Sequence, residues 1–359
     1  MVECNFFRRG KMAITIIGAG AIGGVLGAYL IRAGETVIFC DIAEDHVSKM
    51  NLHGITIEGP DETFTVKGTA YTPEQLVERN VPLETIFLCV KAHHTEKALL
   101  PFLPLLTPDS QIISLQNGLC ERKISKMIGE ERTIGCFVNF SADYLEPGRI
   151  LYGGVASLYL GELDGSISSR ITVLKEKLQC WGPAQVTDNI WGYLWGKMSY
   201  AGLLYATALV DETMAEVVRR QDLRGMLMEL CSEILEVADK LNVSPLGFDD
   251  WEPALVYPRE QRNRKELEAQ LEKLAKRMAA NKKTKSGIWR DLAVRKRETE
   301  VDAQLGDVLE IGKNNGVEMP LLSALVDSIK EIEQGTREMS WDNLYELKKI
   351  YESLPTKAS

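Results

Sequence analysis

The sequence has 359 residues, which is enough for two domains. Its apolar content of 45% and charged content of 26% are typical of a soluble globular protein. The net charge of −9 argues against nucleic-acid binding as the main function, because that function needs a clustered basic face. No apolar run approaches the roughly 20 residues needed to span a bilayer. We therefore expect neither a nucleic-acid nor a membrane partner.

The seven cysteines are scattered along the chain, and several fall within apolar strand patterns. None of them has the C-x-x-C spacing, or any other spacing typical of metal ligands. Reduced, buried thiols are the simplest interpretation, and they are typical of a cytoplasmic protein. We expect no bound metal.

A strand, a glycine-rich loop and a helix follow one another near the start of the chain. Residues 13–17, AITII, form a β-branched apolar run that predicts a buried parallel strand. The loop Gly18-Ala19-Gly20-Ala21-Ile22-Gly23 comes next, and a helical pattern then extends to Ala33, with Gly34 placed to end it. The loop has the G-x-G-x-x-G spacing of dinucleotide-binding sites.

Each glycine of the loop has an expected task. Gly18 allows the tight turn, Gly20 lets the backbone approach a diphosphate, and Gly23 lets the helix pack closely on the strand. The diphosphate would lie at the helix N-terminus beside Ala21 and Ile22, where unpaired N–H groups favour an anion. The alternative is a glycine-rich turn without a ligand. The flanking strand and helix favour a dinucleotide site over that alternative.

A second apolar strand, residues 36–40, ends at Asp41, about 20 residues after the loop. A carboxylate at this position can accept hydrogen bonds from the ribose hydroxyls of NAD, whereas it repels the 2′-phosphate of NADP. The next four residues, Ile42 to Asp45, include no Arg or Lys that could bind that phosphate. The sequence therefore predicts that NADH is preferred over NADPH.

The remainder of the first domain alternates between strands and helices. We expect a helix at 43–52, a hairpin at 54–58 and 64–67, and strands at 85–90, 111–115 and 133–138, with further short strands and one helix up to residue 186. This alternation is typical of a doubly wound parallel sheet. Lys91 and Asn117 follow two of the strands, so they should meet Gly18 and Asp41 at the carboxyl edge of the sheet. The alternatives are a surface lysine and a simple Asn-Gly turn.

From residue 189 onward the strand patterns cease and helical periodicity replaces them. We expect helices at 190–210, 222–241, 265–281, 297–315, 321–334 and 341–351. The predicted domains are therefore a Rossmann-type dinucleotide-binding domain, residues 12–188, and an all-α domain, residues 189–354. The charge-dense segment 259–285 is interpreted as a solvated helix with i,i+4 pairs among Glu268, Glu272 and Lys276.

Two residues of the helical domain are candidates for catalysis. Lys197 lies in the aromatic segment 191–209, WGYLWGKMSYAGLLYATAL, where an ammonium group is costly unless it is paired or used. Glu300 lies in Thr299-Glu300-Val301-Asp302 and could equally be an ordinary surface acid.

Together these motifs resemble the ketopantoate reductase family (2-dehydropantoate 2-reductases). The resemblance covers nearly the whole chain: the glycine loop, Val90-Lys91, Gln116-Asn117-Gly118, W-x-K at Lys197 and T-E-V-D around Glu300. It implies a Rossmann domain followed by a helical domain, as in 6-phosphogluconate dehydrogenases. It also implies hydride transfer from a nicotinamide to the C2 carbonyl of a 2-oxo acid.

The resemblance also implies roles for individual residues. Lys197 would be the general acid that protonates the developing alkoxide, and Glu300 would hold the substrate or the lysine. Lys91 and Asn117 would line the nicotinamide and substrate pocket.

The chain departs from the family where the substrate is recognised. The family has asparagines one and two turns after the catalytic lysine, and these positions are Ala201 and Tyr205 here. Its carboxylate-binding serine falls at Gly287, with Ser286 beside it. We expect Ala201, Tyr205 and Ser286 to line the substrate site.

Three functions follow from these comparisons of motifs. The leading one is reduction of ketopantoate to pantoate. The second is a D-2-hydroxyacid dehydrogenase of the same family that acts on another branched or aryl 2-oxo acid. The third, more remote, is a non-catalytic NAD(H)-binding sensor, which would need neither Lys197 nor Glu300. The helical domain could mediate a homodimer, although no pattern requires one.

Overall fold

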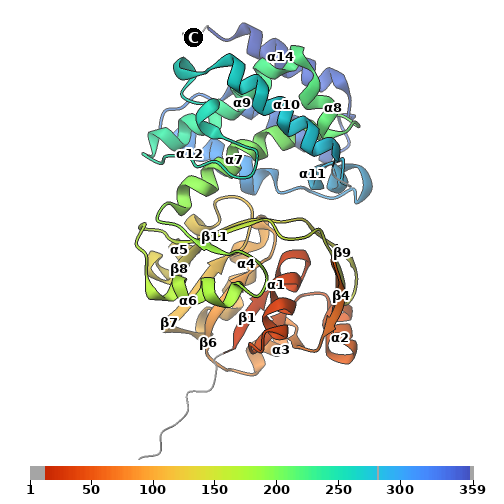
Figure 1. Ribbon diagram of the computed structural model, residues 1–359, viewed down its shortest axis with the longest axis vertical. Coiled ribbons are helices and arrows are strands. Elements are labelled where there is room, and N and C mark those ends of the chain that lie inside the picture. The colour runs from red at the N-terminus through yellow and green to blue at the C-terminus, as the bar shows by residue number, and fades with distance from the viewer. Residues whose placement is uncertain (1–12, 281–282, 356–359) are drawn as a thin grey trace, which may run out of the picture. The chain divides into compact units, whose positions relative to one another are not determined.

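The computed structural model describes residues 13–280 and 283–355. The chain divides into two compact units between Ile190 and Trp191, and each unit is described by itself (Figure 1). Residue 12, the expected start of the first domain, and Asn281, the expected end of one helix, lie outside the described residues.

The first unit is built on an eight-stranded sheet with the order β12-β11-β8-β7-β6-β1-β2-β5. Its neighbouring strands pair in parallel, except for the antiparallel pair β8–β11. All four residues of β1 are buried, as expected of a parallel strand covered on both faces. The strands are β1 (Ile14–Ile17), β2 (Val37–Cys40), β5 (Thr69–Tyr71), β6 (Leu83–Leu88), β7 (Leu106–Ser114), β8 (Thr133–Asn139), β11 (Ser157–Glu162) and β12 (Gln185–Val186).

The helices of this unit connect the strands, as the alternating pattern predicts. They are α1 (Ala21–Arg32), α2 (Glu44–His53), α3 (Pro73–Glu78), α4 (Thr95–Leu99), α5 (Glu121–Ile128) and α6 (Ser169–Leu178), with the 3₁₀ turns η1 (Ala92–His94), η2 (Leu100–Leu105) and η3 (Glu130–Arg132). Helix α1 ends as predicted, with Gly34 in a left-handed conformation (φ 83°). Both α1 and α6 contribute to the hydrophobic core that covers the sheet.

A second, four-stranded sheet packs against α1. Its order is β4-β3-β10-β9, and its strands are β3 (Ile55–Glu58), β4 (Thr63–Val66), β9 (Ala142–Glu146) and β10 (Arg149–Tyr152). The antiparallel pair β3–β4 is the expected hairpin. The parallel pairing of β10 with β3 joins segments about 90 residues apart, and no local pattern indicated it. Buried Ile55, Ile57 and Ile150 attach this sheet to the core.

The second unit is helical (Figure 1). Its helices are α7 (Ile190–Thr207), α8 (Met214–Arg219), α9 (Gln221–Lys240), α10 (Arg264–Ala280), α11 (Gly287–Trp289), α12 (Asp307–Asn314), α13 (Pro320–Glu333) and α14 (Trp341–Ser353). The 3₁₀ turns η4 (Pro253–Leu255) and η5 (Arg259–Gln261) precede α10, and two π-helical segments, η6 (Arg290–Val294) and η7 (Asp302–Gly306), precede α12.

The helix expected at 297–315 begins only after Glu300. Asp291 accepts hydrogen bonds from Arg295 and Arg297, both at 3.0 Å, and Lys296 between them has a left-handed backbone (φ 47°). These contacts tie the residues after η6 back to Asp291 in a tight turn. Residues 297–300 are therefore not helical, and the expected helix begins at Val301.

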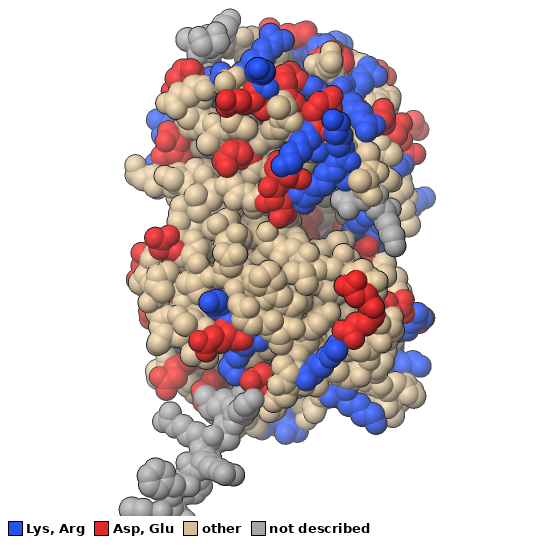
Figure 2. All heavy atoms as spheres, viewed as in Figure 1, with Lys and Arg blue, Asp and Glu red and all other residues tan. Residues whose placement is uncertain are grey.

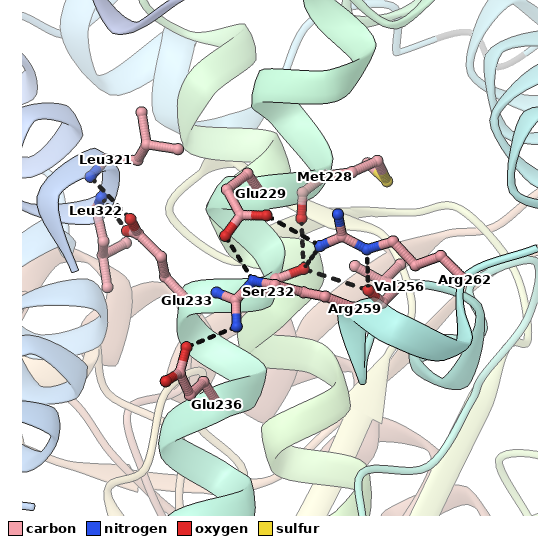
Figure 3. A network of polar contacts seen from close by, with 10 residues as sticks. All are labelled: Met228, Glu229, Ser232, Glu233, Glu236, Val256, Arg259, Arg262, Leu321 and Leu322. Carbon is pink, nitrogen blue, oxygen red and sulfur yellow. Dashed lines mark hydrogen bonds and ion pairs between the residues drawn. The ribbon is translucent and has the colours of Figure 1, made fainter. Parts of the chain in front are cut away.

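The charged segment 259–285 is less solvated than we expected. The Arg259 side chain is 10% exposed, and it pairs with Glu229 at 2.6 Å and with Glu236 at 2.7 Å, both from α9 (Figure 3). Helix α10 buries an apolar stripe that includes Leu271 and Leu274.

The expected pairs within α10 are also replaced. Glu268 and Glu272 both pair with Arg224 of α9, whose side chain is 6% exposed. Figure 2 shows basic side chains over the helical unit in the region of α10, with acidic side chains among them. Many of these charged side chains therefore form ion pairs between different elements of the unit.

A buried carboxylate joins two helices of the same unit. Glu233 of α9 accepts hydrogen bonds from the backbone N–H groups of Leu321 and Leu322, at 3.1 and 2.8 Å, in the first turn of α13 (Figure 3). Burial raises the pKa of this carboxyl group to about 7, although the two N–H donors oppose the shift.

Among the described residues, none of the helices is both long and apolar enough to traverse a bilayer. Cysteines 40, 89, 120, 136, 180 and 231 form no disulfide bonds with one another.

Candidate functional site

The glycine loop connects β1 to α1 and has the backbone that its sequence requires. Gly18 is left-handed (φ 93°), and a Cβ there would lie 2.9 Å from backbone atoms of Cys89 and Val90. A Cβ on Gly23 would lie 2.2 Å from the Gly18 carbonyl oxygen. Packing within the protein therefore excludes a side chain at both positions.

Gly20 differs from the other two glycines of the loop. A Cβ at Gly20 would meet no atom within 4 Å, so packing does not require glycine there. Gly20 is the N-cap of α1, no side chain caps this helix, and its first turn has no acidic residue. The N–H groups at Ala21 and Ile22 are thus presented at an open helix N-terminus, which fits an anion such as a diphosphate.

Asp41 lies at the carboxyl end of β2 and contacts the glycine loop directly. Its Oδ2 accepts a hydrogen bond from the Ala19 N–H at 2.9 Å, and its Oδ1 accepts one from the Ala43 N–H at 3.0 Å. Each carboxylate oxygen has two lone pairs, so these bonds leave acceptor sites for ribose hydroxyls. Asp41 therefore fixes the loop as well as providing the expected acid.

The remaining candidates of this unit lie at the same edge of the sheet. Strands β7, β6, β1 and β2 are consecutive neighbours, so the residues that follow them converge, as predicted for Gly18, Asp41, Lys91 and Asn117. Strand β6 ends at Leu88, earlier than expected, and Lys91 precedes the turn η1. Asn117 is exposed.

Gln116 holds the turn that carries Lys91. Its side-chain amide donates to the Val90 carbonyl oxygen and to the Thr95 hydroxyl, both at 2.9 Å. Thr95 in turn donates to the Ala92 carbonyl oxygen at 2.7 Å. Gln116 is therefore more than a member of the Gln116-Asn117-Gly118 motif, because it links the Lys91 turn to the strand end that precedes Asn117.

In the helical unit, Lys197 is the only charged residue of α7. Its side chain is half-buried, and so are Tyr193, Ala201 and Leu204. These positions are spaced by four, four and three residues, so they share one face of the helix. Ala201 therefore lies on the face of Lys197, as expected.

Tyr205 does not share this face. A residue eight positions after Lys197 is rotated about 80° from it, whereas Leu204, at seven positions, is rotated only about 20°. Tyr205 is 1% exposed and lies in the core of the unit. Its expected place in the substrate site stays a prediction, and the helix phase puts Tyr205 on a different face of α7 from Lys197.

The Tyr205 hydroxyl lies beside the segment that carries Glu300. It is hydrogen-bonded to Thr299, and burial raises the pKa of the phenol well above its ordinary value, with a further contribution from Glu300. Thr299 donates to Glu333 of α13 through its N–H at 2.7 Å and its hydroxyl at 2.6 Å. Glu300 is thus attached to α7 and α13 by its neighbour.

Ser286 is buried and caps α11, since its hydroxyl oxygen accepts a hydrogen bond from the Trp289 N–H at 3.1 Å. Its own hydroxyl proton remains for another partner. Gly287 is exposed, and a Cβ there would meet no atom within 4 Å.

Three residues that contact the candidate segments were not predicted from the sequence, namely Gln116, Thr299 and His46. His46 is buried in the first turn of α2, and its ring contacts the Ala19 carbonyl oxygen. The spacing of these residues gave no signal, because each acts through a partner that is distant in the chain.

Comparison with known proteins places both units in one family. The model of "Ketopantoate reductase PanE/ApbA" matches residues 14–165, and that of "Ketopantoate reductase PanE/ApbA C terminal" matches residues 189–333.

Two relatives are named 2-dehydropantoate 2-reductase. The one from Mesorhizobium japonicum is 29% identical over 66% of this chain and 79% of its own length. The one from Pyrococcus horikoshii is 26% identical over 91% of this chain and 100% of its own.

Among solved structures, a ternary complex of D-mandelate dehydrogenase with NADH and anilino(oxo)acetate has a TM-score of 0.75 to this chain. It is 24% identical, and the match covers 90% of this chain and 99% of that one. At this identity the likeness shows the shared fold.

Proposed function

Because this chain belongs to the ketopantoate reductase family, we propose that it reduces a 2-oxo acid to a D-2-hydroxy acid with NADH as the hydride donor. Residues of the first unit would hold the cofactor: the loop Gly18–Gly23 with Asp41, and Lys91 and Asn117 at the same sheet edge. The observation that carries the proposal is Lys197, the only charge on the otherwise uncharged helix α7. The bound NADH would supply the hydride that reaches C2 of the substrate.

Lys197 would act as the general acid. Reduction at C2 places negative charge on the carbonyl oxygen, and an ammonium group within hydrogen-bonding distance both stabilises that charge and donates the proton. Glu300 would hold the ammonium group or the substrate. Its attachment through Thr299 to α7 and α13 supports this role, because a positioning acid must itself be held in place.

The preference for NADH rests on Asp41. Its carboxylate stands where the 2′-phosphate of NADPH would be accommodated in this fold, and Ile42 to Asp45 add no cation there. The hydrogen bonds from Ala19 and Ala43 hold the carboxylate in place, so it cannot easily turn away from an added phosphate.

Ketopantoate is the first substrate to test. A second candidate, a bulky or aryl 2-oxo acid, is favoured by the face of α7 that carries Lys197. On this face Ala201 takes a position where the resemblance places an amide side chain, and Leu204, one turn further on, is also apolar. A site without amide donors discriminates poorly in favour of a substrate hydroxyl. The shared fold with D-mandelate dehydrogenase is consistent with this candidate.

The remaining candidate residues receive different roles. Tyr205 would not contact the substrate; its hydroxyl would hold Thr299, the neighbour of Glu300, in place. Ser286, with its hydroxyl proton unused by the cap of α11, would help to bind the substrate carboxylate. We retain the division into a dinucleotide domain, 12–188, and a substrate domain, 189–354, as part of the proposal.

The experiment is a panel of NADH oxidation assays with ketopantoate, 2-oxoisovalerate and phenylglyoxylate. Reduction of at least one of them to the D-hydroxy acid supports the proposal, and the ratio of kcat/KM values identifies the substrate class. NADH binding without oxidation by any 2-oxo acid would contradict it and favour the NAD(H) sensor.

A further inference from the structure

One buried imidazole lies against the glycine loop. His46 of α2 is 1% exposed, and both of its ring nitrogens are engaged. Nδ1 accepts a hydrogen bond from the Gly148 N–H at 2.9 Å, and Nε2 lies 2.9 Å from the Ala19 carbonyl oxygen. The ring also makes an edge contact with Tyr144, at 5.1 Å between ring centroids.

These partners determine where the proton of the imidazole lies. A backbone N–H can only donate, so Nδ1 must be unprotonated to accept from Gly148. A neutral ring then carries its proton on Nε2, which donates to the Ala19 carbonyl oxygen. The geometry therefore requires the neutral ring with its proton on Nε2.

The Ala19 residue is consequently held from two sides. Its N–H donates to Asp41, and its carbonyl oxygen accepts from His46. Ala19 lies between Gly18 and Gly20, the two glycines of the loop that give its backbone the most freedom. Two side chains thus restrict a segment that its sequence leaves loose.

The planarity of the peptide bond carries this restraint to Gly20. In a trans peptide, the Gly20 N–H points opposite to the Ala19 carbonyl group. Because His46 holds that carbonyl oxygen on the α2 side, the Gly20 N–H is directed away from α2. Gly20 is the residue whose Cβ position is open, at the uncapped N-terminus of α1.

We propose that His46 is a positioning residue of the dinucleotide site, which turns the Ala19–Gly20 peptide so that the Gly20 N–H donates to the diphosphate. The proposal rests on the dinucleotide assignment and not on the identity of the 2-oxo acid. The proposal also assigns a function to the four-stranded sheet. Gly148, between β9 and β10, anchors His46, so this sheet supports the cofactor loop.

The test compares two substitutions of similar size. In His46→Phe the ring can still pack on Tyr144, but both hydrogen bonds are lost. In His46→Gln the side-chain amide offers one acceptor and one donor, which can replace those bonds in part. We expect His46→Phe to weaken NADH binding by roughly 10- to 100-fold, as for the loss of hydrogen bonds that leaves buried groups unsatisfied. His46→Gln should recover most of that loss.

The readout is the equilibrium dissociation constant of NADH, measured by fluorescence without a 2-oxo acid. ADP-ribose and adenosine serve as competing ligands that contain and lack the diphosphate. We expect His46→Phe to weaken the binding of ADP-ribose as much as that of NADH. The binding of adenosine should weaken by less than about twofold, because in this proposal the Gly20 N–H donates to the diphosphate, which adenosine lacks.

Three results would overturn the proposal: NADH binding by folded His46→Phe within about twofold of wild type, equal weakening of adenosine and ADP-ribose, or no recovery in His46→Gln. If His46→Phe does not fold, His46→Asn replaces it. The shorter amide can accept from Gly148 but does not reach Ala19, so it should weaken NADH while His46→Gln does not. Failure of wild-type protein to bind NADH would instead contradict the dinucleotide assignment.

Discussion

Asp41→Asn should change the choice between NADH and NADPH. In the wild type the carboxylate accepts hydrogen bonds from the N–H groups of Ala19 and Ala43, at 2.9 and 3.0 Å. An asparagine side chain keeps the shape but has one acceptor oxygen and no charge. The loss of one of these hydrogen bonds to the loop weakens the binding of both cofactors to the same extent. It therefore cancels in the ratio of their kcat/KM values.

Two contributions remain in that ratio. A ribose hydroxyl bonds more weakly to an amide oxygen than to a carboxylate, which costs NADH about 1 kcal/mol. A charge pair at about 4 Å and an effective dielectric constant of about 20 amounts to about 4 kcal/mol. Solvent screening reduces this repulsion of the 2′-phosphate to about 1–2 kcal/mol. The sum of about 2–3 kcal/mol corresponds to a change of about 30- to 150-fold.

The assay is steady-state oxidation of NADH and NADPH by wild type and variant with one 2-oxo acid at saturation. The wild type should prefer NADH, and the variant should lose about 30- to 150-fold of that preference. Glu44→Gln is the matched control, since it removes an exposed carboxylate in the first turn of α2 and should leave the ratio unchanged. A wild-type preference for NADPH, or an equal effect of both substitutions, would refute the assignment of Asp41.

Three further outcomes are expected. Lys91→Ala should raise the KM of the 2-oxo acid more than it lowers kcat, because Lys91 positions anionic groups; a selective fall in kcat would contradict this. Ala201→Asn should raise the relative kcat/KM for ketopantoate over 2-oxoisovalerate by roughly 10-fold, since it adds an amide to the Lys197 face; an unchanged ratio would place Ala201 outside the substrate site. Glu233 has a folded-state pKa of about 7 against an ordinary value of 4.5, so the folded protein retains a proton there and stability falls as pH rises through that interval. A Gln amide nitrogen cannot accept from a backbone N–H, so Glu233→Gln loses one of the two bonds to Leu321 and Leu322 at every pH. From pH 4.5 to pH 8, the difference in unfolding free energy between variant and wild type in urea should still shift by about 3 kcal/mol in favour of the variant; equal differences at both pH values would show that Glu233 does not titrate in this range.

The sequence predicts the first unit well where local patterns determine the structure. The run at 14–17, the spacing of Gly18, Gly20 and Gly23, and Asp41 at a strand end follow rules that operate over a few residues or one strand–helix–strand unit. The same holds for the convergence of Lys91 and Asn117, because carboxyl ends of neighbouring parallel strands share an edge.

Contacts between distant segments were not predictable in this way. His46 meets Ala19 across 27 residues and Gly148 across 102, and Arg259 meets Glu229 across 30. A charged segment looks solvated in sequence when its partners lie on another element, as with Arg259. Tyr205 shows a different limit. A residue eight positions after Lys197 is about 80° out of phase with it, so a rule of two helical turns does not fix the face on which the residue lies.

The most direct test of the account uses the Lys197→Ala variant. Two quantities are measured: the single-turnover rate constant for oxidation of NADH by a 2-oxo acid, and the dissociation constant of NADH. If Lys197 is the general acid, the variant should fold and bind NADH nearly as the wild type does, while its turnover falls by roughly 10²- to 10⁴-fold. A variant that folds, binds NADH and turns over within a few-fold of wild type would contradict the proposed mechanism.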